Sequence, residues 1–143
     1  MAATKNKEIF LIWIVHGFNN GPNQQPDNWS ENLSQSYIKR YQTETREVLI
    51  GIVDWTVGAR NFFTNYGESA INTIVIGRYM ALLSHQIRLN QLSISSSRTI
   101  CVGHSLGAHV CGFFGKTLKE KEFFQDSRLD KIIGKYSRDL NIS

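Results

Sequence analysis

Residues 99–107 read TICVGHSLG, in which a short apolar run leads directly into a G-x-S-x-G motif. The run over residues 99–102 is typical of a strand buried on both faces of a parallel sheet. A helical pattern follows over residues 106–119. The motif therefore stands between a strand and a helix, where a sharp turn lifts the central Ser105 above the carboxyl edge of a sheet.

The two glycines of the motif, Gly103 and Gly107, permit this turn because a Cβ at either position would collide with neighbouring backbone. His104 fills the variable position and, by the alternation of side chains at a strand end, points away from Ser105. The N-terminus of the following helix favours negative charge developing at the serine hydroxyl. Ser105 is therefore a candidate nucleophile, and the alternative is a Gly/Ser turn without a catalytic role.

The rest of the chain alternates strand and helix patterns. The other predicted strands are the apolar runs at 9–15, 48–53 and 131–133. One helix, capped by Asp27, is predicted through Trp29, Leu33 and Tyr37. A long helix is predicted over about 68–89, with a small-residue seam for packing on the sheet formed by Ala70, Ile74, Gly77 and Ala81. This alternation predicts the α/β class, with a mostly parallel sheet covered by helices on both faces.

The loop after the first predicted strand, His16-Gly17-Phe18, stands at the edge of the sheet where parallel α/β folds bind ligands. A serine nucleophile needs hydrogen-bond donors for its oxyanion intermediate. One donor is the backbone N–H of Leu106, the residue after the serine. We expect the backbone N–H of Phe18 to be the second, with Gly17 allowing the chain to turn in. An ordinary turn with a buried aromatic is the equal alternative for this loop.

Four motifs occur together in one order, namely Val15-His16-Gly17-Phe18, Val53-Asp54-Trp55, the stretch from Tyr66 through Ala70 and Asn72 to Gly77, and residues 102–110. On these motifs the chain resembles the animal lipase family over about residues 8–115. That family contains pancreatic-type triacylglycerol lipases and the phospholipases A1 of insects and venoms.

The resemblance implies a partial α/β-hydrolase fold and hydrolysis of lipid carboxylic esters through an acyl-enzyme on Ser105. It implies Phe18 and Leu106 as oxyanion donors, His16, Gly17 and Asp54 as supporting residues, and no cofactor. It also implies secretion and action at a lipid–water interface. The choice between triacylglycerol and phospholipid substrates stays open.

The end of the chain departs from the family pattern. Members of the family use a Ser, Asp, His triad in that chain order. Where the acid is expected, after residues 132–134, this chain has Tyr136, and Asp139 comes three positions late. The family's histidine lies further on than Ser143. We therefore expect the triad acid and base to be absent.

The histidines that are present have structural interpretations. His16 belongs to the expected oxyanion loop, and His104 to the turn. His109 is expected on the helix face that packs on the sheet, and His85 in solvent late in the long helix. Asp54 resembles a strand-end hydrogen-bonding aspartate of the family rather than the triad acid.

Residues 1–143 are therefore expected to form a single partial lipase domain, with a divergent tail over 116–143, that is inactive by itself. The competing interpretation is a non-catalytic lipid- or protein-binding module on a lipase-like scaffold. A partial sheet leaves an apolar strand edge uncovered, which predicts self-association through that edge.

The composition excludes other classes of protein. A hydrophobic fraction of 41% with 20% charged residues indicates a globular domain rather than a disordered chain. The net charge of +4 is spread evenly, so we expect no nucleic-acid partner. The longest apolar run, residues 9–15, is too short to span a membrane, and no signal-peptide cleavage site follows it. Cys101 and Cys111 are expected to be small core residues, and no zinc-ligand spacing indicates a metal site.

Overall fold

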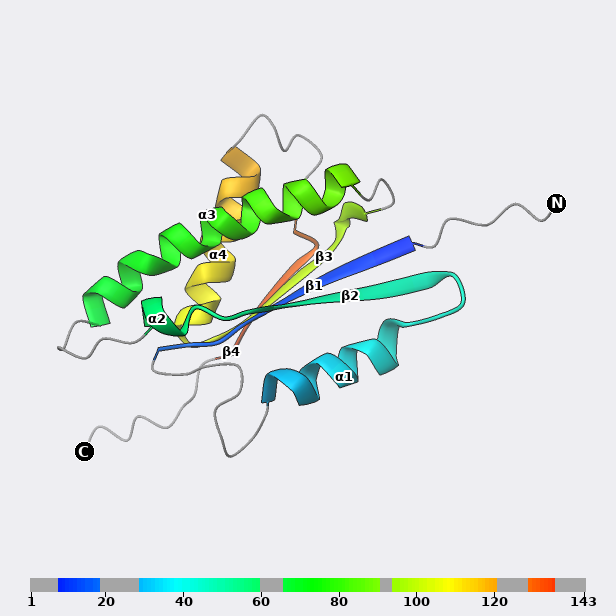
Figure 1. Cartoon of the computed structure of the whole chain (residues 1–143), viewed down its shortest axis with the longest axis horizontal. Coiled ribbons are helices and arrows are strands. Elements are labelled where there is room, and N and C mark those ends of the chain that lie inside the picture. Colours follow the sequence, from blue (N-terminus) through cyan, green and yellow to red (C-terminus); the bar gives the residue numbers. More distant parts are fainter. Residues whose placement is uncertain (1–7, 19–28, 60–65, 91–93, 121–128, 136–143) are drawn as a thin grey trace.

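The structure is a computed structural model that describes residues 8–18, 29–59, 66–90, 94–120 and 129–135 (Figure 1). Within these residues the strands are β1 (Glu8–Val15), β2 (Arg46–Val53), β3 (Ile94–His104) and β4 (Lys131–Lys135). The helices are α1 (Trp29–Tyr41), α2 (Thr56–Ala59), α3 (Tyr66–Asn90) and α4 (Leu106–Glu120).

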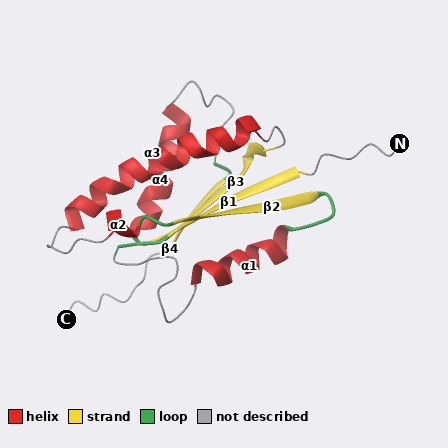
Figure 2. Cartoon of the chain, in the orientation of Figure 1, coloured by secondary structure: helices red, strands yellow, loops and turns green. Residues whose placement is uncertain are grey.

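All four strands pair in parallel, in the order β2-β1-β3-β4. Figures 1 and 2 show α1 on one face of this sheet and α3 and α4 on the other. The predicted α/β class is confirmed, and the arrangement is consistent with a partial α/β-hydrolase fold. Because the strands run in the same direction, the loops that follow β1, β2 and β3 meet at one edge of the sheet.

Strand β1 explains why helices cover both faces. Its side chains alternate between two apolar clusters, and none from Phe10 to Val15 is more than 6% exposed. Toward α4 the strand contributes Leu11, Trp13 and Val15. Toward α1 it contributes Phe10, Ile12 and Ile14. Burying each large apolar side chain stabilises the fold by about 1.5–3 kcal/mol, so one uniformly apolar strand forms the centre of both clusters.

The seam of α3 differs from the predicted one. The buried residues are Ser69, Thr73, Gly77, Met80 and Ala81, so the predicted Gly77 and Ala81 are buried whereas Ala70 and Ile74 are only half-buried. This face also packs mainly on α4 rather than directly on the sheet. A Cβ at Gly77 would lie 2.8 Å from Phe113 Cβ and from the Phe114 backbone nitrogen. Gly77 therefore lets α3 approach the backbone of α4.

The element boundaries agree with the sequence patterns at most places. Helices α1, α3 and α4 occupy the predicted segments, whereas β3 begins at Ile94, earlier than predicted. The expected cap Asp27 lies outside the described residues.

Helix α2 was not predicted, although its start has a sequence signal. The Asp54 carboxylate accepts the Thr56 backbone N–H at 3.0 Å, as a helix-capping aspartate does.

The two cysteines form a disulfide, which corrects the expectation that they are only core residues. Cys101 on β3 and Cys111 on α4 are both fully buried, and their Cα atoms lie 5.7 Å apart. The turn at Ser105 reverses the chain, so the second turn of α4 lies beside the end of β3. The bond therefore closes a loop around that turn.

The outer strands carry exposed apolar side chains. They are Leu49 and Ile52 on β2, and Ile132 on β4, at 39–45% exposure. None of the described helices is long and apolar enough to cross a membrane.

Candidate active site

Ser105 occupies a strained turn between β3 and α4. Its φ is +53°, and among the described residues it is the one non-glycine residue with positive φ. The left-handed conformation costs an L-residue roughly 1–2 kcal/mol. Such strain persists where surrounding structure fixes it, and it concentrates at functional sites. The geometry is that of a nucleophile elbow, in which a serine projects from a sharp strand-to-helix turn.

Close backbone packing fixes this turn. A Cβ at Gly103 would overlap with the backbone of Gly107 and Ala108, and a Cβ at Gly107 would overlap with the carbonyl of Val15. The chain therefore requires glycine at both positions for close approach. The same contacts bring the end of β1 against the start of α4.

The loop after β1 lies directly against the serine. A Cβ at Gly17 would lie 2.8 Å from Ser105 Cβ and 2.8 Å from the His104 carbonyl oxygen. Phe18 is half-buried and packs edge-on against Tyr66, with ring centroids 5.5 Å apart. The structure thus brings the backbone of Gly17 against Ser105.

Leu106 is the first residue of α4, and its side chain is buried. The first four N–H groups of a helix have no carbonyl partner within the helix. The Ala108 N–H instead donates to the Ser105 carbonyl at 2.9 Å, which tightens the turn. The helix therefore begins at the serine, and its positive end lies where negative charge would develop.

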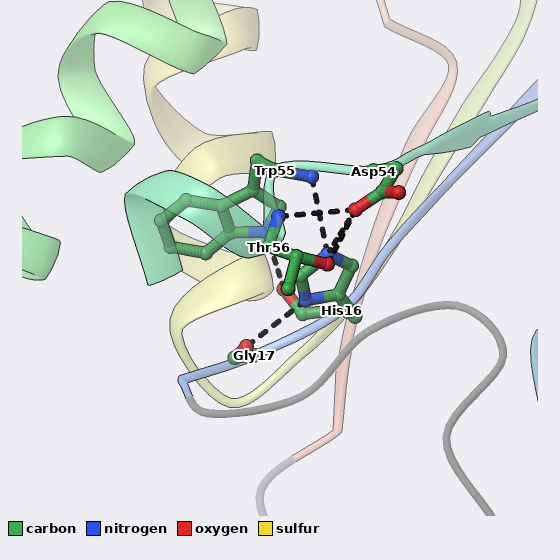
Figure 3. A network of polar contacts seen from close by, with 5 residues as sticks. All are labelled: His16, Gly17, Asp54, Trp55 and Thr56. Atoms are coloured by element: carbon green, nitrogen blue, oxygen red, sulfur yellow. Dashed lines mark hydrogen bonds and ion pairs between the residues drawn. The ribbon is translucent and has the colours of Figure 1, made fainter. Parts of the chain in front are cut away.

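His16 connects the loop after β1 to the end of β2 (Figure 3). Its Nδ1 lies 3.0 Å from the Gly17 carbonyl oxygen, and its Nε2 accepts the Trp55 backbone N–H at 3.1 Å. The Trp55 indole N–H donates to the His16 carbonyl at 2.8 Å. Trp55 was not among the predicted site residues, although it belongs to the Val53-Asp54-Trp55 motif, which was a signal for it.

His16 and Asp54 differ in their protonation and in their exposure to solvent. Burial lowers the pKa of His16, against the opposing effects of the Gly17 carbonyl and Asp54. Hydrogen bonds from Thr56 lower the pKa of Asp54. The 3.7 Å between His16 Nε2 and Asp54 Oδ1 is not an ion pair at neutral pH, because Nε2 is occupied as an acceptor. Asp54 is thus a hydrogen-bonding strand-end residue with an exposed carboxylate.

Of the other histidines, His104 also lies beside Gly17, where a Cβ would be 3.4 Å from its Nδ1. His104 packs on Trp29 of α1, with ring centroids 5.9 Å apart. His109 is exposed, so the expected packing on the sheet was wrong, because α4 turns Leu106, Val110 and Phe114 inward instead. His85 is half-buried rather than fully in solvent. Tyr136 and Asp139 lie outside the described residues.

No group of histidine, cysteine or acidic side chains that could hold a metal ion occurs within the described part of the chain.

Comparison with known proteins agrees with this geometry. Residues 2–134 match the family model Lipase. A phospholipase A1 of Polybia paulista is 32% identical over 129 residues, covering 85% of this chain and 37% of the relative. A phospholipase A1 of Solenopsis invicta is 30% identical, covering 80% of this chain and 32% of the relative.

Phospholipase A1 4 of Polistes dominula is 31% identical over 145 residues, covering 91% of this chain and 42% of the relative. The chain therefore spans less than half the length of these relatives. With the family model matching most of its residues and an elbow serine at the strand end, the chain belongs to the lipase family.

Proposed function

We propose that this chain carries the nucleophile and the oxyanion-binding backbone of a lipid carboxylic ester hydrolase. The observation that supports this most is the left-handed Ser105 against which the loop of Gly17 packs. In this proposal Ser105 is the nucleophile. The backbone N–H groups of Phe18 and Leu106 bind the oxyanion.

The reaction is acyl transfer to serine. Ser105 Oγ attacks the ester carbonyl carbon, and in the complete reaction a base, which is not assigned among the residues of this chain, takes the hydroxyl proton and returns it to the departing alcohol oxygen. Water then hydrolyses the acyl-serine by the same route. The two N–H groups bind the negative oxygen in each tetrahedral intermediate, and losing one such donor typically costs about 2.7–4 kcal/mol.

The substrate class follows from the relatives. Proteins named phospholipase A1 are 30–32% identical to this chain over alignments that cover 80–91% of it. We propose a lipid ester at a lipid–water interface as the substrate, without a choice between triacylglycerol and phospholipid.

The proposal includes an incomplete triad. Neither an acid nor a base is assigned in this chain, and the matched relatives are more than twice as long. Serine hydrolases that lack a triad member keep about 10³–10⁴-fold catalysis over water. We therefore propose that residues 1–143 form one partial domain with a reactive serine and little turnover.

The disulfide supports an extracellular location. Disulfides persist in oxidising compartments and are rare in the cytosol. The fully buried Cys101–Cys111 bond lies inside the core rather than on an accessible surface. This agrees with the secretion that the family resemblance implies.

The exposed apolar residues of the outer strands support self-association. Leu49 and Ile52 lie on β2, the outer strand beside β1, and Ile132 lies on β4 at the other end of the sheet. Such strands are templates for pairing with another chain. Sedimentation of the purified chain would give a mixture of oligomers if this is correct, and a uniform monomer if it is not.

A non-catalytic lipid-binding module is the second candidate, favoured by the absence of an assigned acid and base. A fluorophosphonate separates the two, because Ser105 Oγ displaces fluoride from phosphorus and keeps the phosphonyl group. Mass spectrometry of the labelled chain should locate the adduct on Ser105.

Two variants control this experiment. Ser105→Ala should abolish labelling, whereas Ser36→Ala, at an exposed serine on α1, should not change it. Binding to phospholipid vesicles without any adduct on Ser105 would instead support the module and refute the esterase proposal.

A further inference from the structure

His16 makes hydrogen bonds through both nitrogens of its ring, and these define its protonation (Figure 3). The Gly17 carbonyl oxygen, 3.0 Å from Nδ1, can only accept a hydrogen bond. The Trp55 backbone N–H, 3.1 Å from Nε2, can only donate one. The two contacts together require a neutral ring that carries its proton on Nδ1.

The hydrogen bond at Nδ1 of His16 also determines the direction of the Phe18 backbone N–H. The Gly17 C=O and the Phe18 N–H belong to one planar peptide, and in the trans form they point in opposite directions. Holding the carbonyl toward the His16 ring therefore directs the Phe18 N–H away from that ring. Gly17 lies against Ser105, so this peptide borders the space beside the serine.

His16 is itself held firmly. Its side chain is 1% exposed and stacks on the Trp55 ring, with centroids 5.7 Å apart and planes 23° apart. The Trp55 indole also donates to the His16 backbone carbonyl at 2.8 Å. Trp55 thus holds both the ring and the backbone of His16, which leaves the Nδ1 proton directed at Gly17.

We propose that His16 is a positioning residue that holds the Gly17–Phe18 peptide with its N–H available to the oxyanion and its carbonyl turned away. This inference rests on the proposed function. Without the Nδ1 bond the peptide is free to rotate about its flanking bonds. The Gly17 carbonyl would then face the oxyanion, removing a donor and adding a repulsive dipole.

Two substitutions separate this role from a merely structural one. In His16→Asn the amide nitrogen occupies nearly the position of Nδ1 and can donate to Gly17, but the contact with Trp55 is lost. In His16→Gln the amide reaches the position of Nε2 and keeps the contact with Trp55, but the donor to Gly17 is lost. Both variants disturb the core, and only one removes the bond that orients the peptide.

The readout is the rate of phosphonylation of Ser105 by a fluorophosphonate. It is measured at a temperature where circular dichroism shows both variants folded. We expect His16→Gln to slow labelling about 10²–10³-fold, as for a lost oxyanion donor, and His16→Asn to slow it less than about tenfold. The exposed His109→Asn is the control and should leave the rate unchanged.

Proton–nitrogen correlation spectra of the unaltered chain give an independent readout that needs no variant to fold. At neutral pH we expect Nδ1 of His16 to be protonated and Nε2 not. A proton on Nε2, or equal labelling rates in the Asn and Gln variants, would overturn the inference while leaving the esterase proposal intact. Absence of Ser105 labelling in the unaltered chain would refute the esterase proposal, and the positioning role with it.

Discussion

Breaking the Cys101–Cys111 disulfide should destabilise the fold by an amount that its sequence separation defines. The bond closes a loop with a separation of 10 residues. For a loop of this length, the chain-entropy model gives about 9 cal/mol/K, or about 2.7 kcal/mol at room temperature. Because the bond restricts the unfolded chain, this stabilisation is lost even if the folded structure does not change.

The corresponding fall in melting temperature is measurable. The entropy of unfolding is about 2.1 cal/mol/K per residue, so 143 residues give about 0.3 kcal/mol/K. Dividing the loss of free energy by this entropy predicts a fall of about 9 °C. A chain of ordinary stability, at about 5–15 kcal/mol, would remain folded but much closer to unfolding.

The assay is thermal unfolding followed by circular dichroism, with and without reductant. Because both sulfurs are fully buried, the chain must be unfolded in reductant and then refolded, and a thiol assay must confirm the reduction. The double variant Cys101→Ala/Cys111→Ala is the control, and its melting temperature should not respond to reductant. Equal melting temperatures of the oxidised and reduced chains, or free thiols in the untreated chain, would refute the reasoning.

The other predictions concern a helix contact and the pH dependence of stability. Gly77→Leu should separate α3 from α4 and cost about 1–3 kcal/mol or more in urea unfolding, because a Cβ there meets the α4 backbone. Gly112→Ala, where a Cβ meets nothing, should instead stabilise the fold by up to about 1 kcal/mol. A Gly77→Leu variant more stable than Gly112→Ala would contradict the packing. Because burial lowers the pKa of His16 below its ordinary 6.5, the unfolded chain binds the proton first as the pH falls. The free energy of unfolding should therefore decrease as the pH falls below about 6.5. His16→Asn should flatten this dependence of the free energy of unfolding on pH. An unchanged dependence in that variant would show that His16 is not buried in its neutral form.

Much of the fold could be predicted because its strands are buried on both faces. Residues 9–15 and 99–102 are almost uniformly apolar, which occurs when helices cover both sides of a parallel sheet. The seam of α3 was less predictable because the helix packs on α4, and periodicity alone does not say which neighbour a helix meets. Polar Ser69 and Thr73 are buried on this helix, whereas its exposed face carries Ile71 and Tyr79.

The proposed site residues Ser105, Leu106 and Gly17 stand at strand ends or in a glycine turn, where local rules predict the course of the backbone. The disulfide was missed because Cys101 and Cys111 lie on different elements and meet only after the chain reverses at Ser105. The hydrogen bonds between His16 and Trp55 were missed for the same reason. They join residues 39 positions apart in the sequence, which only the pairing of β1 with β2 brings together.

A crystal structure of the phosphonylated chain would show whether Ser105 faces backbone donors from two separate loops. This arrangement predicts the phosphonyl oxygen at about 2.7–3.1 Å from the backbone nitrogens of both Phe18 and Leu106. An adduct whose oxygen points into solvent, or whose Phe18 nitrogen is beyond hydrogen-bond distance, would contradict it.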